Sequence, residues 1–212
     1  MRQFLAAMQG VSVAPQAGIV AAYDFVRGHY TTSERVVPCF RNSQSNLSQA
    51  SLNRDMLRML ELEPGMTIAD LGSGCGITAN SFAVFGASKV VGYEFHALSC
   101  DVARDMALKI RASSAAKGFG DVAMPSFVSG AVNDHLSAAH GLTFDRLHGG
   151  YMMSQANATK YVRENLSANG VAVLNVGRRN DGEIIIYRKD AAGNVQSRNS
   201  GISVIFQEDH KP

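Results

Sequence analysis

The 212-residue sequence lacks the features that mark several common classes of protein. Its 20 Lys and Arg side chains nearly balance 18 Asp and Glu side chains, which argues against nucleic acid or a membrane surface as its partner. No run approaches the roughly 18 consecutive apolar residues of a membrane-spanning helix. Residues 1–16 carry one arginine and only a short apolar patch, which is poor material for a signal peptide. We therefore expect a soluble, cytoplasmic protein with no membrane partner.

Cysteine is also scarce. Cys39, Cys75 and Cys100 are odd in number and show neither CxxC nor Cys/His ligand spacing. This pattern favours reduced thiols over a disulfide framework and gives no support for a zinc site. The histidines lack partners at metal-ligand spacing as well, so we expect no bound metal.

Short apolar runs alternate with helical patterns along the chain. The runs are rich in apolar and β-branched residues and are bounded by Gly, Pro or Asn, as buried parallel strands are. The five predicted strands are 66–71, 90–95, 126–129, 145–148 and 171–176. Between them, apolar residues recur at helical spacing. The two predicted helix faces are Leu52, Met56, Met59 and Leu60, and Leu98, Val102, Met106 and Ile110.

The end of the chain breaks this alternation. Residues 182–189 and 202–208 read as two strands joined by the turn-rich segment 190–201, which predicts a terminal hairpin. The whole pattern predicts an α/β fold with a doubly wound, mostly parallel sheet and an antiparallel edge strand. We expect one compact unit, with a helical extension over residues 1–45 and a Rossmann-like domain over residues 46–212.

A glycine-rich turn follows the first predicted strand, in the stretch IADLGSGCGITA (68–79). Gly72, Gly74 and Gly76 alternate there with Ser73 and Cys75. A glycine turn at the carboxyl end of a strand is where nucleotide-like cofactors bind in open α/β sheets, because the missing Cβ atoms let a ligand approach the main chain. We therefore expect these five residues to lie beside a cofactor.

Two acidic residues indicate which cofactor it is. Asp70 precedes the glycines and Glu94 ends the next strand, 24 residues further on. A carboxylate at the tip of the second strand can accept both hydroxyls of a ribose, and Asp70 can hold a cationic amino group. A pyrophosphate would be repelled by a carboxylate beside the turn. Ribose combined with an amino acid indicates S-adenosylmethionine rather than NAD. The alternative is that Asp70 only caps the turn and Glu94 is a solvated strand end.

The motifs ADLGSGCG and GYEFH resemble those of the Rossmann-like, class I S-adenosylmethionine methyltransferases. Most of the chain resembles one branch, the protein-L-isoaspartate O-methyltransferases. The segments NLSQASLNRDMLRMLELEPG, FDRLHGG and LSANGVAVLNVG are similar to that family's serine loop with its helix, its fourth strand and its fifth strand. The resemblance implies the class I fold and methyl transfer from S-adenosylmethionine to a protein or peptide carboxylate such as L-isoaspartate.

The resemblance also implies roles for residues around the turn. It places Ser48 on the family's active-site serine, with Asn46 and Leu47 in the substrate loop, although a serine there is also a favoured helix N-cap. It places Phe95 and His148 at the cofactor. His148 could instead act as a base.

Two further positions complete the predicted site. The segment Gly130-Ala131 stands beside the adenine, where the family usually has Gly-Asp-Gly, so Ala131 removes a polar partner. Tyr151 is a candidate substrate contact, or a core residue.

Two other functions stay open at this point. Over a shorter span, the same motifs resemble non-SET lysine methyltransferases, which need a desolvated pocket or a base because lysine must lose a proton before it attacks. A binding module that keeps the fold without turnover is the other alternative. A carboxylate that attacks a sulfonium methyl needs no general base, so positioning is the main requirement of the leading hypothesis. The sequence indicates no oligomeric state.

Overall fold

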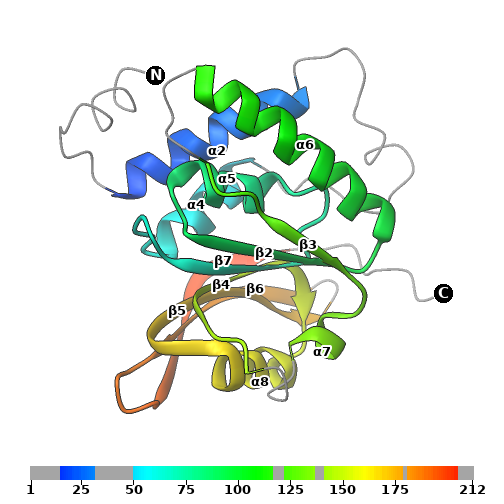
Figure 1. Ribbon diagram of the computed structural model, residues 1–212. Coiled ribbons are helices and arrows are strands. Elements are labelled where there is room, and N and C mark those ends of the chain that lie inside the picture. Colours follow the sequence, from blue (N-terminus) through cyan, green and yellow to red (C-terminus); the bar gives the residue numbers. More distant parts are fainter. Residues whose placement is uncertain (1–14, 32–49, 117–121, 137–140, 179–180, 205–212) are drawn as a thin grey trace.

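The computed structural model describes residues 15–31, 50–116, 122–136, 141–178 and 181–204. Its centre is a seven-stranded sheet with the strand order β3-β2-β1-β4-β5-β6-β7 (Figure 1). The first five strands are parallel, β6 is antiparallel to β5, and β7 is antiparallel to β6. The strands are β1 (Thr67–Leu71), β2 (Lys89–Glu94), β3 (Ser126–Ser129), β4 (Phe144–Met153), β5 (Leu166–Arg178), β6 (Asp181–Lys189) and β7 (Val195–Val204). This confirms the predicted doubly wound sheet with an antiparallel edge.

Helices cover both faces of the sheet, as Figure 1 shows. One face carries α2 (Pro15–Thr31), α4 (Ala50–Met59), α5 (Ile77–Phe85) and α6 (Ala97–Ala116), and the other carries α7 (Val132–His135) and α8 (Gln155–Asn165). Each side has its own apolar core, because strand side chains alternate between the two faces. None of the described helices is long and apolar enough to cross a membrane.

The helix α2 supplies the helical extension of the predicted fold. Its buried side chains recur every three or four residues, which is the period of one helix face; they are Ile19, Ala22, Tyr23, Val26 and Tyr30. This face packs against α5, where Gly18 allows the Phe85 ring to approach closely. The predicted N-terminal helical extension is therefore present at residues 15–31, where it packs on α5 and α4.

The last strand begins earlier than predicted, at Val195 rather than Ile202. The turn of the hairpin is short: Asp190 accepts a hydrogen bond from the Asn194 amide at 2.8 Å, and Gly193 takes a φ of 87°. The strand that follows is mostly exposed and polar because it lies at the edge of the sheet. Such a strand gives little apolar signal, which is why its first residues read as a turn.

The predicted buried face of α6 is only partly correct. Met106 and Ile110 are buried as predicted, but Leu98 is 56% exposed, and Cys100, Ala103 and Ala107 complete the buried face. Small side chains at three of these positions let the helix lie close to the sheet. Of the two cysteines in the described residues, Cys100 is a free thiol whose pKa is raised to about 11 by burial, but Cys75 is disulfide-bonded. The prediction of reduced thiols therefore fails at Cys75.

Asp145, at the start of β4, makes the stability of this fold depend on pH. Burial alone would raise its pKa, but hydrogen bonds from the Thr67 amide (2.8 Å), the Thr67 hydroxyl (2.9 Å) and the Ser167 hydroxyl (3.1 Å) outweigh burial and lower it. A lowered pKa in the folded state contributes stability above the unfolded pKa, and this contribution is lost as the pH falls through the folded value.

We therefore expect Asp145→Asn to be less stable than the wild type at pH 7, with the gap closing below about pH 4, where the unfolded carboxyl also protonates. Urea denaturation of both proteins between pH 7 and pH 3 measures this gap. A gap that stays constant across the range would contradict the role of the ionised carboxylate.

Candidate functional site

The parallel strands bring most of the predicted cofactor residues to one edge of the sheet. Asp70 of β1 is in register with Gly92 of β2 on one side and with His148 of β4 on the other, and Glu94 is in register with Ser129 of β3. Asp70 and Glu94 lie at or near the carboxyl ends of β1 and β2, and His148 lies midway along the longer β4. In open α/β sheets, ligands bind at this edge, where the strand order reverses.

The glycine turn requires its glycines for two reasons. Gly72, Gly74 and Gly76 all take positive φ angles, of 75°, 52° and 84°. Space is also lacking: a Cβ on Gly76 would lie 2.7 Å from the Ala103 Cβ and 2.9 Å from Cζ of Phe127. Gly76 is also the N-cap of α5, so the turn passes directly into the helix.

We expect Gly76→Ala to destabilise the fold by about 2 to 3 kcal/mol, from backbone strain together with overpacking. Gly193→Ala is the matched control, since Gly193 has a similar φ of 87° but no atom within 4 Å of the added Cβ. It should cost about 1 kcal/mol from strain alone. Equal losses in urea denaturation would show that close packing at Gly76 is unimportant.

Backbone hydrogen bonds hold the turn in place. The Tyr93 carbonyl accepts from the amides of Gly72 (2.8 Å) and Ser73 (3.0 Å), and the Gly74 amide donates to Glu94 Oε2 at 2.9 Å. The Ser73 hydroxyl lies against Gly92 of β2. Because these amides already have acceptors, and one acceptor is a carboxylate, the turn offers no amide nest for a pyrophosphate.

Glu94 lies at the centre of this arrangement. Its side chain is 7% exposed, Oε2 accepts from Gly74 and Oε1 accepts from the His96 amide at 3.0 Å. A carboxylate has about four acceptor positions, so room remains for two hydroxyl donors. Phe95 follows directly and is 59% exposed. The Gly130 amide donates to the Glu94 carbonyl at 3.0 Å, which brings the segment Gly130-Ala131 to the same place.

Asp70 and His148 form a buried pair beneath the turn. Asp70 Oδ1 lies 2.7 Å from His148 Nδ1, and the two residues are 1% and 2% exposed. The imidazole ring also makes an edge contact with Phe82. Asp70 Oδ2 is buried and has no hydrogen-bond partner in the described part of the chain. This carboxylate therefore has one buried oxygen whose capacity to accept a hydrogen bond is unused by the described residues.

The sequence matches the protein-L-isoaspartate(D-aspartate) O-methyltransferase family over residues 20–206. The chain belongs to this family. Membership confirms the predicted class of enzyme, an S-adenosylmethionine-dependent methyltransferase of the protein-L-isoaspartate O-methyltransferase type. Enzymes of this family act on protein substrates.

Solved structures share the fold of this family member. A protein-L-isoaspartate O-methyltransferase from Plasmodium falciparum, solved in complex with S-adenosyl-L-homocysteine, is 14% identical with a TM-score of 0.68, over 98% of this chain and 97% of that one. The C-terminal domain of a precorrin-6Y C5,15-methyltransferase from Rhodobacter capsulatus is 17% identical with a TM-score of 0.50, over 63% and 65% of the two chains. No curated protein sequence matches the chain.

The other predicted site residues of the methyltransferase are placed as follows. Tyr151 packs against the glycine turn: a Cβ on Gly72 would lie 2.8 Å from Tyr151 Cδ1. The predicted substrate loop, Asn46, Leu47 and the catalytic candidate Ser48, lies outside the described residues. Its roles therefore stay predictions.

Sequence reasoning missed two residues that support the turn. Tyr30 of α2 donates from its hydroxyl to the Cys75 carbonyl at 2.6 Å, and Asn80 of α5 donates to the Tyr30 hydroxyl at 3.3 Å. Burial raises the pKa of Tyr30, so its hydroxyl stays a donor at neutral pH. The apolar spacing of α2 was the available signal, since it predicts that Tyr30 faces inward, but its partner depends on the packing of α2 on α5.

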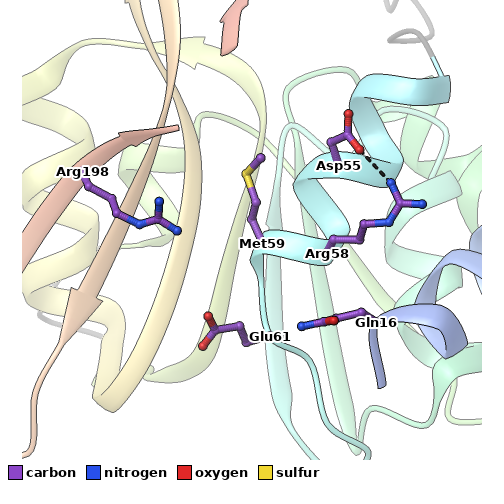
Figure 2. A pocket seen from close by; sticks show the side chains of 6 residues that line it. All are labelled: Gln16, Asp55, Arg58, Met59, Glu61 and Arg198. Carbon is purple, nitrogen blue, oxygen red and sulfur yellow. Dashed lines mark hydrogen bonds and ion pairs between the residues drawn. The ribbon is translucent and has the colours of Figure 1, made fainter. Parts of the chain in front are cut away.

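A separate hollow of about 330 Å³ lies between α4 and the terminal hairpin (Figure 2). Its lining is charged: Arg58 is paired with Asp55 at 2.7 Å, and Glu61 is paired with Arg188 on β6. The lining residues are Gln16, Asp55, Arg58, Met59, Glu61 and Arg198. None of them belongs to the predicted cofactor site, and the paired charges leave no clear preference for a ligand of either sign.

Proposed function

We propose that this enzyme transfers the methyl group of S-adenosylmethionine to the carboxylate of an isoaspartyl residue in a protein or peptide, with the cofactor on the glycine turn. The observation that carries the proposal is the pair of buried carboxylates flanking this turn. Glu94 retains acceptor positions that suit two ribose hydroxyls, and Asp70 Oδ2 is an unused acceptor that suits the amino group.

The remaining cofactor contacts are assigned by their positions. The exposed Phe95 ring would cover one side of the adenine, and the segment Gly130-Ala131 would lie at its edge. The related Plasmodium falciparum structure, which is in complex with S-adenosyl-L-homocysteine, supports a cofactor of this kind on the shared fold.

When bound, the cofactor supplies a methyl group on a positively charged sulfur. A carboxylate acceptor is already ionised at neutral pH, so the protein has no proton to remove. Its residues must orient the acceptor and exclude water, and orientation can contribute several kcal/mol to the lowering of the barrier. We therefore assign His148 to holding Asp70 rather than to general-base catalysis, because the acceptor has no proton to lose and the imidazole, 2% exposed, is enclosed beside Phe82.

The proposed activity has a direct test. An isoaspartyl peptide and its normal aspartyl twin are incubated with the enzyme and labelled S-adenosylmethionine, and we expect label only on the first, as an ester lost in mild base. Base-stable label on a lysine peptide would instead show that lysine, and not a carboxylate, is the methyl acceptor. Failure to bind S-adenosyl-L-homocysteine in calorimetry would reject the cofactor site itself.

Ser48 is the proposed residue that orients the acceptor carboxylate. We expect Ser48→Ala to lower turnover by about tenfold or more, with little change in affinity for S-adenosyl-L-homocysteine, because the lost hydrogen bond belongs to the reacting complex. Methyl transfer, calorimetry and melting temperature are measured on one preparation. A variant that loses about 1 kcal/mol of stability and keeps full activity would show a helix N-cap instead.

We further propose that nucleic acid is not a substrate, since the sequence carries a formal net charge of only +2. The cytoplasmic location predicted above stays a prediction. Its cysteine argument no longer holds, because Cys75 is disulfide-bonded.

A further inference from the structure

A row of three hydrogen-bonding side chains lies behind the glycine turn. Tyr151 Oη lies 3.4 Å from Tyr161 Oη, and the Tyr161 hydroxyl donates to Asn133 Oδ1 at 2.7 Å. Since a phenol has one proton and Tyr161 uses it on Asn133, Tyr151 is the donor between the two phenols. The row therefore connects β4, α8 and α7.

One end of the row rests on the first glycine of the turn. A Cβ on Gly72 would lie 2.8 Å from Tyr151 Cδ1 and 3.2 Å from the Tyr151 amide nitrogen. Gly150 is equally close, because a Cβ there would lie 2.5 Å from the Gly72 carbonyl oxygen. The position of the Tyr151 ring and the path of the turn are therefore tightly coupled by packing.

The other end holds the segment proposed to lie beside the adenine. Asn133 belongs to the four-residue helix α7, which directly follows Gly130-Ala131. This segment is tied to β2 by the Gly130 amide, and α7 has no side-chain N-cap. The Tyr161 hydroxyl is thus one anchor of this short helix, together with His135, whose Nε2 lies 3.2 Å from the Ser129 carbonyl oxygen.

Tyr161 is suited to this role by its surroundings. The Tyr161 side chain projects from α8 and is fully buried in the core. Burial raises its pKa, so the hydroxyl keeps its proton at neutral pH. A buried hydroxyl that both donates and accepts has a fixed orientation, which makes the row a rigid link.

We propose that Tyr151 is a positioning residue for the cofactor, and that the row Tyr151–Tyr161–Asn133 fixes the glycine turn relative to the segment Gly130-Ala131. This inference rests on the proposed function, because it assigns the methionine and adenine ends of one cofactor to those two segments. A site held in its binding geometry before the ligand arrives binds more tightly.

Tyr161→Phe tests the row by removing its central hydroxyl while keeping the ring. We expect the Kd for S-adenosyl-L-homocysteine to rise about fivefold to tenfold and kcat at saturating S-adenosylmethionine to stay within about twofold. Tyr187→Phe is the matched control. Tyr187 of β6 is also buried, and its hydroxyl accepts a hydrogen bond from Gln155 of α8, so this variant removes a buried phenol hydroxyl outside the row. The control should lose stability without losing affinity.

Two further measurements separate positioning from general stability. Combining Tyr151→Phe with Tyr161→Phe should weaken binding no more than Tyr161→Phe alone, because Tyr161→Phe already removes the partner of the Tyr151 hydroxyl in this row. Amide hydrogen exchange in 130–135 of the ligand-free protein should become faster in Tyr161→Phe and not in Tyr187→Phe. If the wild type binds S-adenosyl-L-homocysteine and Tyr161→Phe binds it with the same Kd, this inference alone is overturned. If the wild type does not bind it, the proposed function is overturned and the inference with it.

Discussion

Replacing Glu94 with alanine is expected to weaken binding of S-adenosyl-L-homocysteine by about 30-fold or more, which corresponds to at least about 2 kcal/mol. The physical reason is that the substitution removes the buried carboxylate proposed to accept hydrogen bonds from both ribose hydroxyls. The same change removes the acceptor for the Gly74 and His96 amides, so the turn itself also loosens. Isothermal calorimetry measures the effect, and NAD should not compete with the ligand.

A cycle of variants and ligands separates these two causes. An S-adenosyl-L-homocysteine analogue without ribose hydroxyls should bind the wild type weakly and should lose little further affinity in Glu94→Ala, since the contact is already missing. Glu183→Ala is the charge-matched control, because Glu183 is an exposed residue of the hairpin. If the analogue and the complete ligand lose affinity equally in Glu94→Ala, Glu94 supports the turn and does not bind the ribose.

The parts of this site that the sequence predicts are those whose chemistry is local. Gly72, Gly74 and Gly76 fall within five consecutive positions of the chain, and their positive φ angles follow from a tight turn between a strand and a helix. Asp70 and Glu94 end apolar strands, so parallel pairing alone brings them to the same edge. A repeated pattern and a short spacing were sufficient for both.

The parts that the sequence does not predict depend on contacts between distant segments. Nothing near Tyr161 indicates that its hydroxyl meets Asn133, because that contact depends on how α8 lies under α7. Tyr30 meets Cys75 only because α2 packs on α5. Leu98 shows the converse: it fits the helical period of α6, yet small residues elsewhere on the helix decide which side faces the sheet.

The pairing of Asp70 with His148 gives the largest expected effect on stability. His148→Leu keeps a side chain of similar size but leaves Asp70 Oδ1 buried without a donor, and we expect it to lower the free energy of unfolding by about 3 kcal/mol or more. His148→Asn loses the ring contact with Phe82 but can place an amide donor where Nδ1 lies, so it should retain more stability.

Urea denaturation of the three proteins decides whether the hydrogen bond or the ring packing matters more. If the bond dominates, the order of stability is wild type, His148→Asn, His148→Leu, and adding Asp70→Ala to His148→Leu should recover part of the loss because no buried carboxylate remains unpaired. If packing dominates, His148→Leu is the more stable single variant. That reversed order would also remove the reason for assigning His148 to holding Asp70, since the acceptor oxygen proposed for the cofactor would not depend on it.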